Sequence, residues 1–560
     1  MNQQIDCPSA TAEAPVRVAS LPFSSIPGQS KLFLDYLSDP VSLREFYPNV
    51  ARSHVDLVDF IPTVLGAYSV DRDALCDALA AQHSARVGGQ KALDNIELLR
   101  KENTVAVLTG QQAGLFTGPL YTVYKALSAV RMAECLHSRG HDAVPVFWAA
   151  TEDHDFDEVS HAVVADSESN LSRISYQPDS YVEKEPVGRV SIATDVEECI
   201  VALLAVLPET EFTPVLARML RSSYAAGETF GTAFASLIAR MFEPFGLIVL
   251  DPLDPAIKRL AAPIYAQAVM HSTELVASII ERGKKLIEAG YHTQVEAGAD
   301  YFPLFWHDDD GRRRTLRRAD DGSVHVSGTK TQFPIDALGR IAAEQPERFS
   351  PGVMLRPVVQ DYLFPTLCYF GGGAEIAYFA QNSEAYRVLG RPATPIRHRQ
   401  SFTVVEARYE RSMDKLGLEF TDLFRDADDL TSEIIATLID PQTVRLFADV
   451  EEKINSQLRR LDEALSAFDG TLAAGFANRR RKIIYHIAAT RSRYERERLR
   501  KDEVAERRLR SLFTELVPNG HLQERTLNIT QFLDRYGPYF IDWVYQSIDL
   551  SDDRHRIIHL

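Results

Sequence analysis

The sequence predicts an α/β protein whose strands form an open parallel sheet, together with a separate α-helical domain. Two observations predict this class. Short apolar runs that end in glycines or carboxylates occur at three places, and segments with helical periodicity lie between them. Strands that alternate with helices are typical of a parallel sheet covered by helices. From Glu406 onward the chain becomes helical and highly charged, which indicates the second domain.

The first α/β unit covers residues 104–159. Its opening run, 105–108, is apolar and rich in β-branched residues, which predicts a buried strand. Helical spacing of apolar residues over 120–132 predicts a helix, and the apolar run 144–150 predicts a second strand. Polar residues 151–155 follow this strand, at the edge where open α/β sheets bind ligands. The loop after the first strand is punctuated by three glycines, Gly110, Gly114 and Gly118.

The α/β pattern resumes twice, each time after an insertion. Residues 246–252 predict a strand that leads into a helix over 255–283, and 363–373 predict a strand that ends in three glycines. The alternating, turn-rich texture of 293–349 indicates β-hairpins. The earlier insertion contains two strand-like pieces, 161–164 and 187–192.

The triple glycine, Gly371 to Gly373, has two interpretations. Glycines at a strand-to-helix junction let the backbone approach a ligand closely, and the helix N-terminus favours an anion. The alternative is a tight turn that requires positive φ. The position after an α/β strand favours the functional interpretation.

The charged region predicts an antiparallel helical hairpin whose exposed seam could also pair with a second subunit. A turn at Asp469-Gly470 separates its first helix from a second one over 472–512. Residues 479–510 contain 13 basic and 5 acidic side chains. They are either a nucleic-acid contact or, as we favour, the solvated face of a long helix. Apolar residues recur at every seventh position, as in a coiled-coil seam, at Phe447, Ile454, Leu461 and Phe468.

Composition narrows the function classes. The 560-residue chain has a formal net charge of −17, which argues against nucleic acid as the main partner. No apolar run approaches the length of a membrane span, and the N-terminus predicts no signal peptide. The five cysteines are scattered without a CxxC pair, which argues against a disulfide framework or structural zinc and fits a reducing cytoplasm.

The core motifs together resemble one known family, the cysteine ligase family of bacillithiol biosynthesis, or BshC family. The resemblance runs essentially from end to end of the chain, and a motif this long and composite is more specific than a glycine loop alone. Three segments carry it: Leu108 to Thr122 (LTGQQAGLFTGPLYT), Trp148 with Glu152 to Phe156 (EDHDF), and Gly372 to Tyr378 (GGAEIAY).

The resemblance implies a Rossmann-like core related to class I aminoacyl-tRNA synthetases, with two connecting insertions and a coiled-coil domain that pairs two subunits. It also implies an activity that joins cysteine to glucosaminyl malate to form bacillithiol, and a nucleotide site for ATP or ADP formed in part by helical and C-terminal regions. The expected parts are an N-terminal helical part of the core (1–103), the first Rossmann half (104–159), the first insertion (160–245), further Rossmann core (246–292), the β-rich second insertion (293–350), the second Rossmann half with the glycine loop (351–405), the helical coiled-coil domain (406–515) and a C-terminal segment packing on the core (516–560).

Two departures from synthetase-like enzymes bear on the mechanism. Their HxGH signature corresponds here to 117–120, which contains no histidine, and their lysine-rich KMSKS loop has no clear counterpart besides the basic stretch 397–401. Both signatures stabilise charge on ATP phosphates, so a standard aminoacyl-adenylate mechanism is in doubt. Because no clustered cysteine ligands are present, we predict no metal site.

His154 is the best candidate for a general base, oriented by Asp153 or Asp155. The alternative interpretation of this DHD cluster is a cap at a helix N-terminus. Thr117 completes the predicted catalytic set, as a hydroxyl donor to an anion at the helix start. Lys125, about two turns into that helix, is expected to act only as a distant positive charge.

The remaining candidates bind substrate or nucleotide. The predicted substrate-binding residues are Gln111, Gln112, Gly114, Gly118 and Tyr121. The predicted nucleotide-binding residues are Gly371, Gly372, Gly373, Glu375, Arg525 and Asn528. Three functions stay open: a cysteine-adding ligase, a related ligase or nucleotidyltransferase with another amino acid or acceptor, and a non-catalytic nucleotide-binding scaffold. A tRNA synthetase ranks lower, because both ATP signatures are missing.

Overall fold

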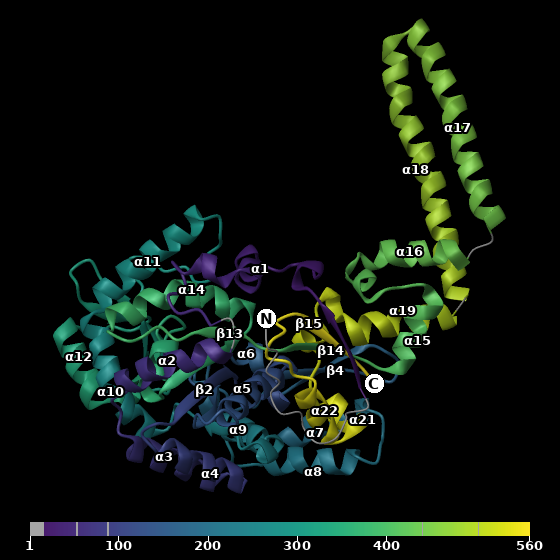
Figure 1. Cartoon of the computed structure of the whole chain (residues 1–560). Helices are drawn as coiled ribbons and strands as arrows, with labels where there is room; N and C mark the ends of the chain where they lie inside the picture. Colours follow the sequence, from purple (N-terminus) through teal and green to yellow (C-terminus); the bar gives the residue numbers. More distant parts are fainter. Residues whose placement is uncertain (1–15, 52–53, 87–88, 439–440, 502) are drawn as a thin grey trace, which may run out of the picture. The chain divides into compact units, whose positions relative to one another are not determined.

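The structure is a computed structural model that describes residues 16–51, 54–86, 89–438, 441–501 and 503–560 (Figure 1). The chain forms two compact units. The described residues of Met1–Ser167, Leu171–Val404 and Gln523–Leu560 make up the core unit, and Glu168–Asn170 with Val405–Leu522 make up the helical unit.

The core unit is built on a five-stranded parallel sheet, which confirms the predicted class. The strands lie in the order β13-β12-β2-β3-β6. The chain lays down three strands outward in one direction, then returns to the other side of the first strand for the last two, so the sheet is doubly wound. The strands are β2 (Val105–Gln112), β3 (Ala143–Ala150), β6 (Ile248–Leu250), β12 (Thr366–Gly371) and β13 (Ile396–His398).

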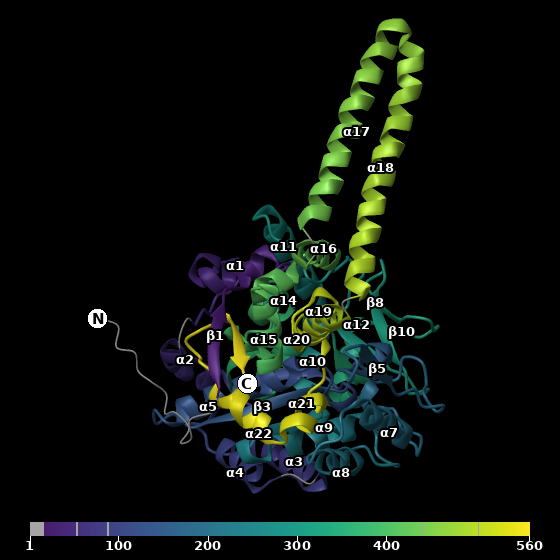
Figure 2. The same cartoon turned by 90° about the vertical axis from the view of Figure 1, so that its right-hand side faces the viewer.

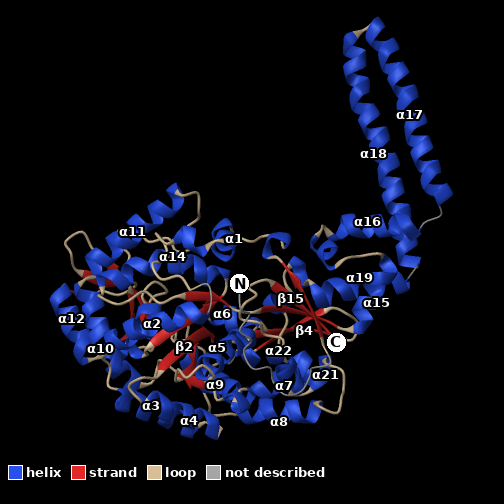
Figure 3. Ribbon diagram, viewed as in Figure 1, coloured by secondary structure: helices blue, strands red, loops and turns tan. Residues whose placement is uncertain are grey.

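Helices surround this sheet (Figure 3). Helix α5 (Tyr121–His137) packs on β2 and β3, and α9 (Phe230–Met241) packs on β6. Helix α14 (Gly373–Val388) packs on β12 and β13, while α3 (Arg72–Ala85) and α4 (Gln90–Leu99) pack against β6. Because every residue of β3 is buried, its sequence is a continuous apolar run rather than an alternating one.

Three local predictions are wrong. Strand β2 continues to Gln112, so Gly110 lies inside the strand; a Cβ there would come within 2.8 Å of the Trp148 carbonyl oxygen on β3. The helix expected over 255–283 is two helices, α10 (Pro255–Met270) and α11 (Ser272–Glu288). The break falls where the Ser272 hydroxyl donates to the Val269 carbonyl, which offers the backbone an alternative to helical bonding.

Residues 187–192 are the third error. They form a 3-10 turn (Val187–Arg189) and an extended piece, and β4 (His161–Ala165) pairs instead with β5 (Leu171–Ser175). The segment is apolar because it is buried under the core, where the Val187 N–H donates to the Asp153 carbonyl. The extended piece makes one antiparallel bridge, between Ser191 and Thr229, in which the Phe230 N–H donates to the Val190 carbonyl. The alternating pattern therefore reflects a single bridge that is too short to form a strand.

The second insertion forms the hairpins that its turns predict. Its antiparallel sheet has the order β10-β9-β8-β7-β11. It also contains α12 (Ile335–Glu344), which the sequence analysis does not predict. The strands are β7 (Leu304–His307), β8 (Arg313–Arg318), β9 (Val324–Val326), β10 (Gln332–Phe333) and β11 (Phe349–Pro351).

The two ends of the described chain meet in one small sheet (Figure 2). Strand β1 (Arg17–Leu21) runs antiparallel to β15 (His555–His559), and β14 (Ser401–Val405) lies on the other side of β15. Of the predicted C-terminal segment, Gln523–Leu560 thus belongs to the core unit, whereas 516–522 belong to the helical unit.

The helical unit contains the predicted hairpin (Figures 1 and 2). Its arms are α17 (Pro441–Phe468) and α18 (Gly470–Lys501), and α19 (Glu503–Leu516) follows. The Asp469 carboxylate accepts from the N–H groups of Thr471 and Leu472 and so caps α18. The seventh-residue seam faces α18 only in part, because straight α-helices drift relative to a heptad repeat. Leu461 is 47% exposed and Phe468 is 84% exposed.

The loop between β2 and α5 is held in a strained conformation by the C-terminal segment. Phe116 and Thr117 have φ angles of 50° and 83°, and both are fully buried. The Asn528 amide donates to the carbonyl oxygens of Phe116 (2.9 Å) and Gly118 (2.7 Å). Non-glycine residues in this region persist only when their surroundings enforce it, and Asn528 supplies that constraint.

We predict that Asn528→Ala lowers the free energy of unfolding by about 2–3 kcal/mol, because two buried carbonyl oxygens lose their donor. Chemical denaturation checks this. The matched control is Thr526→Ala, which removes a half-buried side chain for which the described residues show no hydrogen bond. Equal effects of the two substitutions would contradict the clamping role.

Candidate active site

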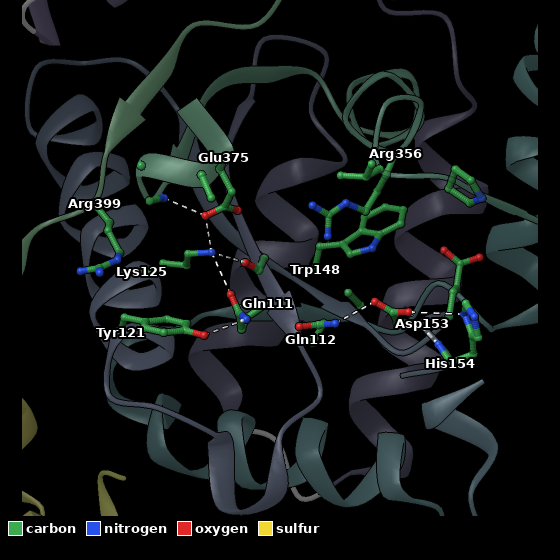
Figure 4. A pocket seen from close by; sticks show the side chains of 18 of the residues that line it. Gln111, Gln112, Tyr121, Lys125, Trp148, Asp153, His154, Arg356, Glu375 and Arg399 are labelled. Carbon is green, nitrogen blue, oxygen red and sulfur yellow. Dashed lines mark hydrogen bonds and ion pairs between the residues drawn. The ribbon is translucent and has the colours of Figure 1, made fainter. Parts of the chain in front are cut away.

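A cavity of about 470 Å³ opens at the carboxyl ends of β2, β3 and β12 (Figure 4). Strands β2 and β12 are neighbours in the sheet, but the chain leaves them toward opposite sides, so this is the topological switch point. The size suits a small molecule. The cavity therefore lies where a doubly wound sheet is expected to bind its ligand.

A buried ion pair connects the two halves of the sheet at this cavity. The Lys125 ammonium on α5 lies 2.5 Å from a Glu375 oxygen on α14, and it donates to the carbonyl of Gly110 and the amide oxygen of Gln111. Glu375 also accepts from the hydroxyl of Tyr369 and the N–H of Gly372. The protein itself therefore supplies the hydrogen-bond and ion-pair partners of both the Lys125 ammonium and the Glu375 carboxylate.

The environment sets the charge state of this pair. Burial favours the neutral form of Glu375, but the Lys125 ammonium and the hydrogen bonds outweigh it, and the pKa of Glu375 is lowered. Burial lowers the pKa of Lys125, against the pull of Glu375. We infer an ionised carboxylate fixed at the N-terminal turn of α14.

A second buried pair supports the floor of the cavity beside β3. The Lys258 ammonium on α10 contacts the Glu152 carboxylate and donates to the Phe349 carbonyl at 2.6 Å. Lys258 is 1% exposed, and Glu152 lines the cavity. This pair ties the end of β3 to the second insertion.

Asp153 and His154 lie together with an arginine from the second insertion. The Asp153 carboxylate accepts from the Gln112 amide (2.8 Å) and the His154 N–H (2.7 Å). Burial raises its pKa, but Arg313 and these hydrogen bonds outweigh burial and leave the pKa below its ordinary value. Arg313 lies 3.1 Å from Nδ1 of His154, whereas the nearest Asp153 oxygen is 3.6 Å from that atom. The histidine ring therefore contacts an arginine, where the sequence analysis predicts a carboxylate.

Three further arginines line the cavity. Arg399 pairs with the buried Glu524 at 2.6 Å, and Arg356 donates to the Tyr378 hydroxyl at 2.7 Å. Arg525 is exposed at the cavity, and the described residues provide it with no hydrogen bond or ion pair. Together with Lys125 and Arg313, five cationic side chains line the cavity, against the three carboxylates Glu152, Asp153 and Glu375. In a chain of net charge −17 this local excess favours an anionic ligand.

The structure brings most of the predicted site residues to this one cavity, substrate and nucleotide candidates alike. The loop candidates do not reach it: Thr117 is fully buried, and Asn528 binds the loop backbone. Asp155 caps α6 (Phe156–Val159) by accepting from the Glu158 N–H, as the alternative interpretation expected. The predicted residues that line the cavity are Gln111, Gln112, Tyr121, Asp153, His154, Gly372, Gly373, Glu375 and Arg525. Those outside its lining are Gly114, Thr117, Gly118, Asp155, Gly371 and Asn528.

The tight-turn interpretation of the triple glycine is wrong. None of the three glycines lies in the left-handed region. A Cβ on Gly371 would come within 2.8 Å of the Glu375 Cβ, so glycine here makes room for the carboxylate that holds Lys125. Gly372 and Gly373 line the cavity.

Sequence reasoning missed several cavity residues. Lys125 is not a distant charge, because its ammonium donates to the Gly110 carbonyl near the end of β2. Arg313 and Arg356 lie in segments with no recognisable motif, far along the chain from the first strand. Only the basic stretch 397–401, which contains Arg399, gave a signal that could have found one of them.

Within the described ranges, no three His, Cys, Asp or Glu side chains are grouped so as to hold a metal ion. No helix in the described part of the chain is long and apolar enough to cross a membrane.

The fold and the cavity define a doubly wound α/β protein with a cation-rich pocket at its switch point. The family model described as the N-terminal Rossmann-like domain of bacillithiol biosynthesis BshC matches residues 16–400. The model of the C-terminal coiled-coil domain of the same family matches residues 402–560. The chain therefore belongs to the BshC family of bacillithiol biosynthesis.

Curated relatives agree with this membership along almost the whole chain. A protein of Koribacter versatilis is 35% identical over 96% of this chain and 99% of its own length. One of Solibacter usitatus is also 35% identical, over 96% and 98%, and one of Salinibacter ruber is 32% identical, over 98% and 100%. All three carry the name "Putative cysteine ligase BshC".

We predict that Glu375→Gln, which keeps the shape but removes the charge, costs about 3–5 kcal/mol of stability at pH 7, because Lys125 is left buried and unpaired. Adding Lys125→Met should restore part of the loss. Since the folded state lowers the pKa of Glu375, the stabilisation is fully present above the ordinary pKa and is lost as the pH falls from there through the lowered pKa of the folded state.

Denaturant unfolding at a series of pH values checks this, and the difference from wild type should shrink below about pH 4. The control is Glu274→Gln, which removes a surface pair with Arg387 and should cost less than about 1 kcal/mol. A Glu375→Gln protein as stable as this control would contradict the role of the pair.

Proposed function

We propose that the protein is a ligase that joins the carboxyl group of cysteine to the amino group of glucosaminyl malate, the step that completes bacillithiol. Family membership and the names of the relatives support a ligase of this pathway. The observation that carries the proposal is the cation-rich cavity at the switch point, because cysteine, the malate moiety and a nucleotide each present negative charge.

The chemistry of amide formation fits the lining. A carboxylate becomes reactive when a phosphoryl or nucleotidyl group is transferred to one of its oxygens. The neutral amine then attacks the carbonyl carbon, the phosphorylated oxygen leaves with the electron pair of its bond to carbon, and the proton that the nitrogen loses passes to this leaving phosphate or to water. Arg356 and Arg525 are placed to hold anionic groups of the substrates, and fixed cations stabilise the charge that develops on the acyl oxygen. ATP is the proposed source of the activating group.

We place the phosphates of this nucleotide at the start of α14. Gly372 and Gly373 line the cavity there, but Glu375 already accepts from the Gly372 N–H, so the phosphates depend on side-chain cations rather than on the helix N-terminus. Arg399 and Arg525 lie on the same cavity. The arrangement supports one shared pocket for nucleotide and substrates, and it places Asn528 in the framework of the loop.

Mass spectrometry of a reaction with purified protein, cysteine, glucosaminyl malate and ATP tests the proposal. We expect a cysteinyl product. A folded, nucleotide-bound protein that forms none would favour another acceptor or the scaffold function.

In the same assay, Arg525→Ala should lower kcat/KM about tenfold to a hundredfold, the cost of one lost charged hydrogen bond. The control is Arg44→Ala, which removes an exposed arginine outside the cavity lining and should leave the rate unchanged. Equal rates for the two variants would show that Arg525 does not contact the substrates.

We also propose that the hairpin pairs two subunits. Leu446 is 62% exposed, and Leu461 and Phe468 on the same arm of the hairpin are exposed as well. Exposed apolar residues on a coiled-coil arm are suited to burial against a second copy.

Leu446→Asp with Leu461→Asp should therefore convert a dimer into a monomer, measured by light scattering during gel filtration. The control is Val201→Asp, at a valine of the core unit that is 52% exposed. A wild-type protein that elutes as a monomer would contradict this pairing.

A further inference from the structure

Contacts with neighbouring protein groups hold the Arg313 side chain in place at the cavity. It is 7% exposed, its Nε donates to the Ser350 hydroxyl at 2.9 Å, and its Nη2 donates to the Pro351 carbonyl at 3.0 Å. The guanidinium also stacks on the ring of Phe305, 3.7 Å from its centroid. These contacts leave Nη1 3.1 Å from Nδ1 of His154 and 3.5 Å from an oxygen of Asp153.

This contact determines which nitrogen of His154 carries the proton. A guanidinium has only donors and does not lose its proton in proteins. Nδ1 must therefore accept with its lone pair, so the ring is neutral and its proton is on Nε2. We infer that His154 acts in the cavity as a hydrogen-bond donor through Nε2, and that Arg313 is the positioning residue that fixes this tautomer.

Burial and the surrounding charges, taken together, also favour the neutral form of the His154 ring. Burial is the largest influence and lowers the pKa of His154, and Arg313 and Lys184 lower it further. Asp153 and Asp155 oppose this but do not outweigh it. His307, nearby on β7, has a pKa held well below its ordinary value by burial and adjacent cations, so it brings no charge. The pKa of His154 thus lies below that of free histidine, so its ring gains a proton only at a lower pH.

A neutral hydrogen-bond donor and a general base have different roles in the reaction. A base at Nε2 needs a free lone pair on that nitrogen, which the Nε2 proton occupies. A donor stabilises negative charge on the acyl oxygen when the amine attacks, and His154 itself then neither gains nor loses a proton. The donor role rests on the proposed function, since that reaction supplies the acyl oxygen, whereas the tautomer does not depend on it.

Proton–nitrogen correlation spectra of the full-length protein with ¹⁵N-labelled histidine test the tautomer without any substrate. The His154 signals are those missing from His154→Gln. We expect a bare Nδ1 and a protonated Nε2 at pH 7, persisting below the ordinary pKa of 6.5. Arg313→Met should raise the pKa of His154, because Asp153 and Asp155 remain, and Arg313→Lys should restore part of the wild-type behaviour. A ring that is protonated on Nδ1 at pH 7 would overturn the inference.

Activity separates donor from base even if the Arg313 variants do not fold. A glutamine amide can replace the Nε2 donor but cannot act as a base. We expect His154→Gln to keep kcat within about tenfold of wild type and His154→Asn, which is too short, to lose about a hundredfold. Equal losses of a hundredfold or more in both would indicate a base and overturn the donor role. If the wild type makes no cysteinyl product, the proposed function fails while the spectra still decide the tautomer.

Discussion

The ion pair between Lys125 and Glu375 is the interaction on which the cavity depends. It joins α5, which follows β2, to α14, which follows β12, at the point where the strand order of the sheet reverses. Two charges buried in this way cost desolvation energy that only close pairing and full hydrogen bonding offset. The carbonyl of Gly110, the amide of Gln111 and the N–H of Gly372 supply that bonding. The same pair thereby fixes the strand ends that line the cavity.

Distant parts of the chain complete the cavity around this pair. The second insertion contributes Arg313 and, through the Phe349 carbonyl, holds the Lys258–Glu152 pair under the end of β3. The C-terminal segment contributes Arg525 and anchors Arg399 through Glu524. Its Asn528 also holds the strained loop that leads into α5. Cations from several separate segments thus converge on one place, which gives an acidic protein a local preference for anions.

The position of Arg313 changes how the polar cluster after β3 is understood. Asp153, His154 and Asp155 look alike as a sequence motif, yet the structure gives each a different task. Asp153 is an ionised acceptor bound by Gln112, His154 is held by a guanidinium, and Asp155 caps a short helix. An arginine at one ring nitrogen imposes the opposite tautomer from a carboxylate there, so a residue from β8 decides the chemistry of a histidine after β3.

The sequence by itself determined the α/β class with its open parallel sheet, the buried strands, the β-hairpins, the helical hairpin and the family, because periodicity and local motifs express which residues must be buried. It also located Gln111, Asp153, His154 and Glu375, which lie at the carboxyl ends of strands or a few residues after them. Only the tertiary structure decided that Lys125 pairs with Glu375, that Arg313 and Arg356 reach the cavity, and that Asn528 belongs to the framework. Such contacts join residues hundreds of positions apart, and no local pattern records a partner that distant.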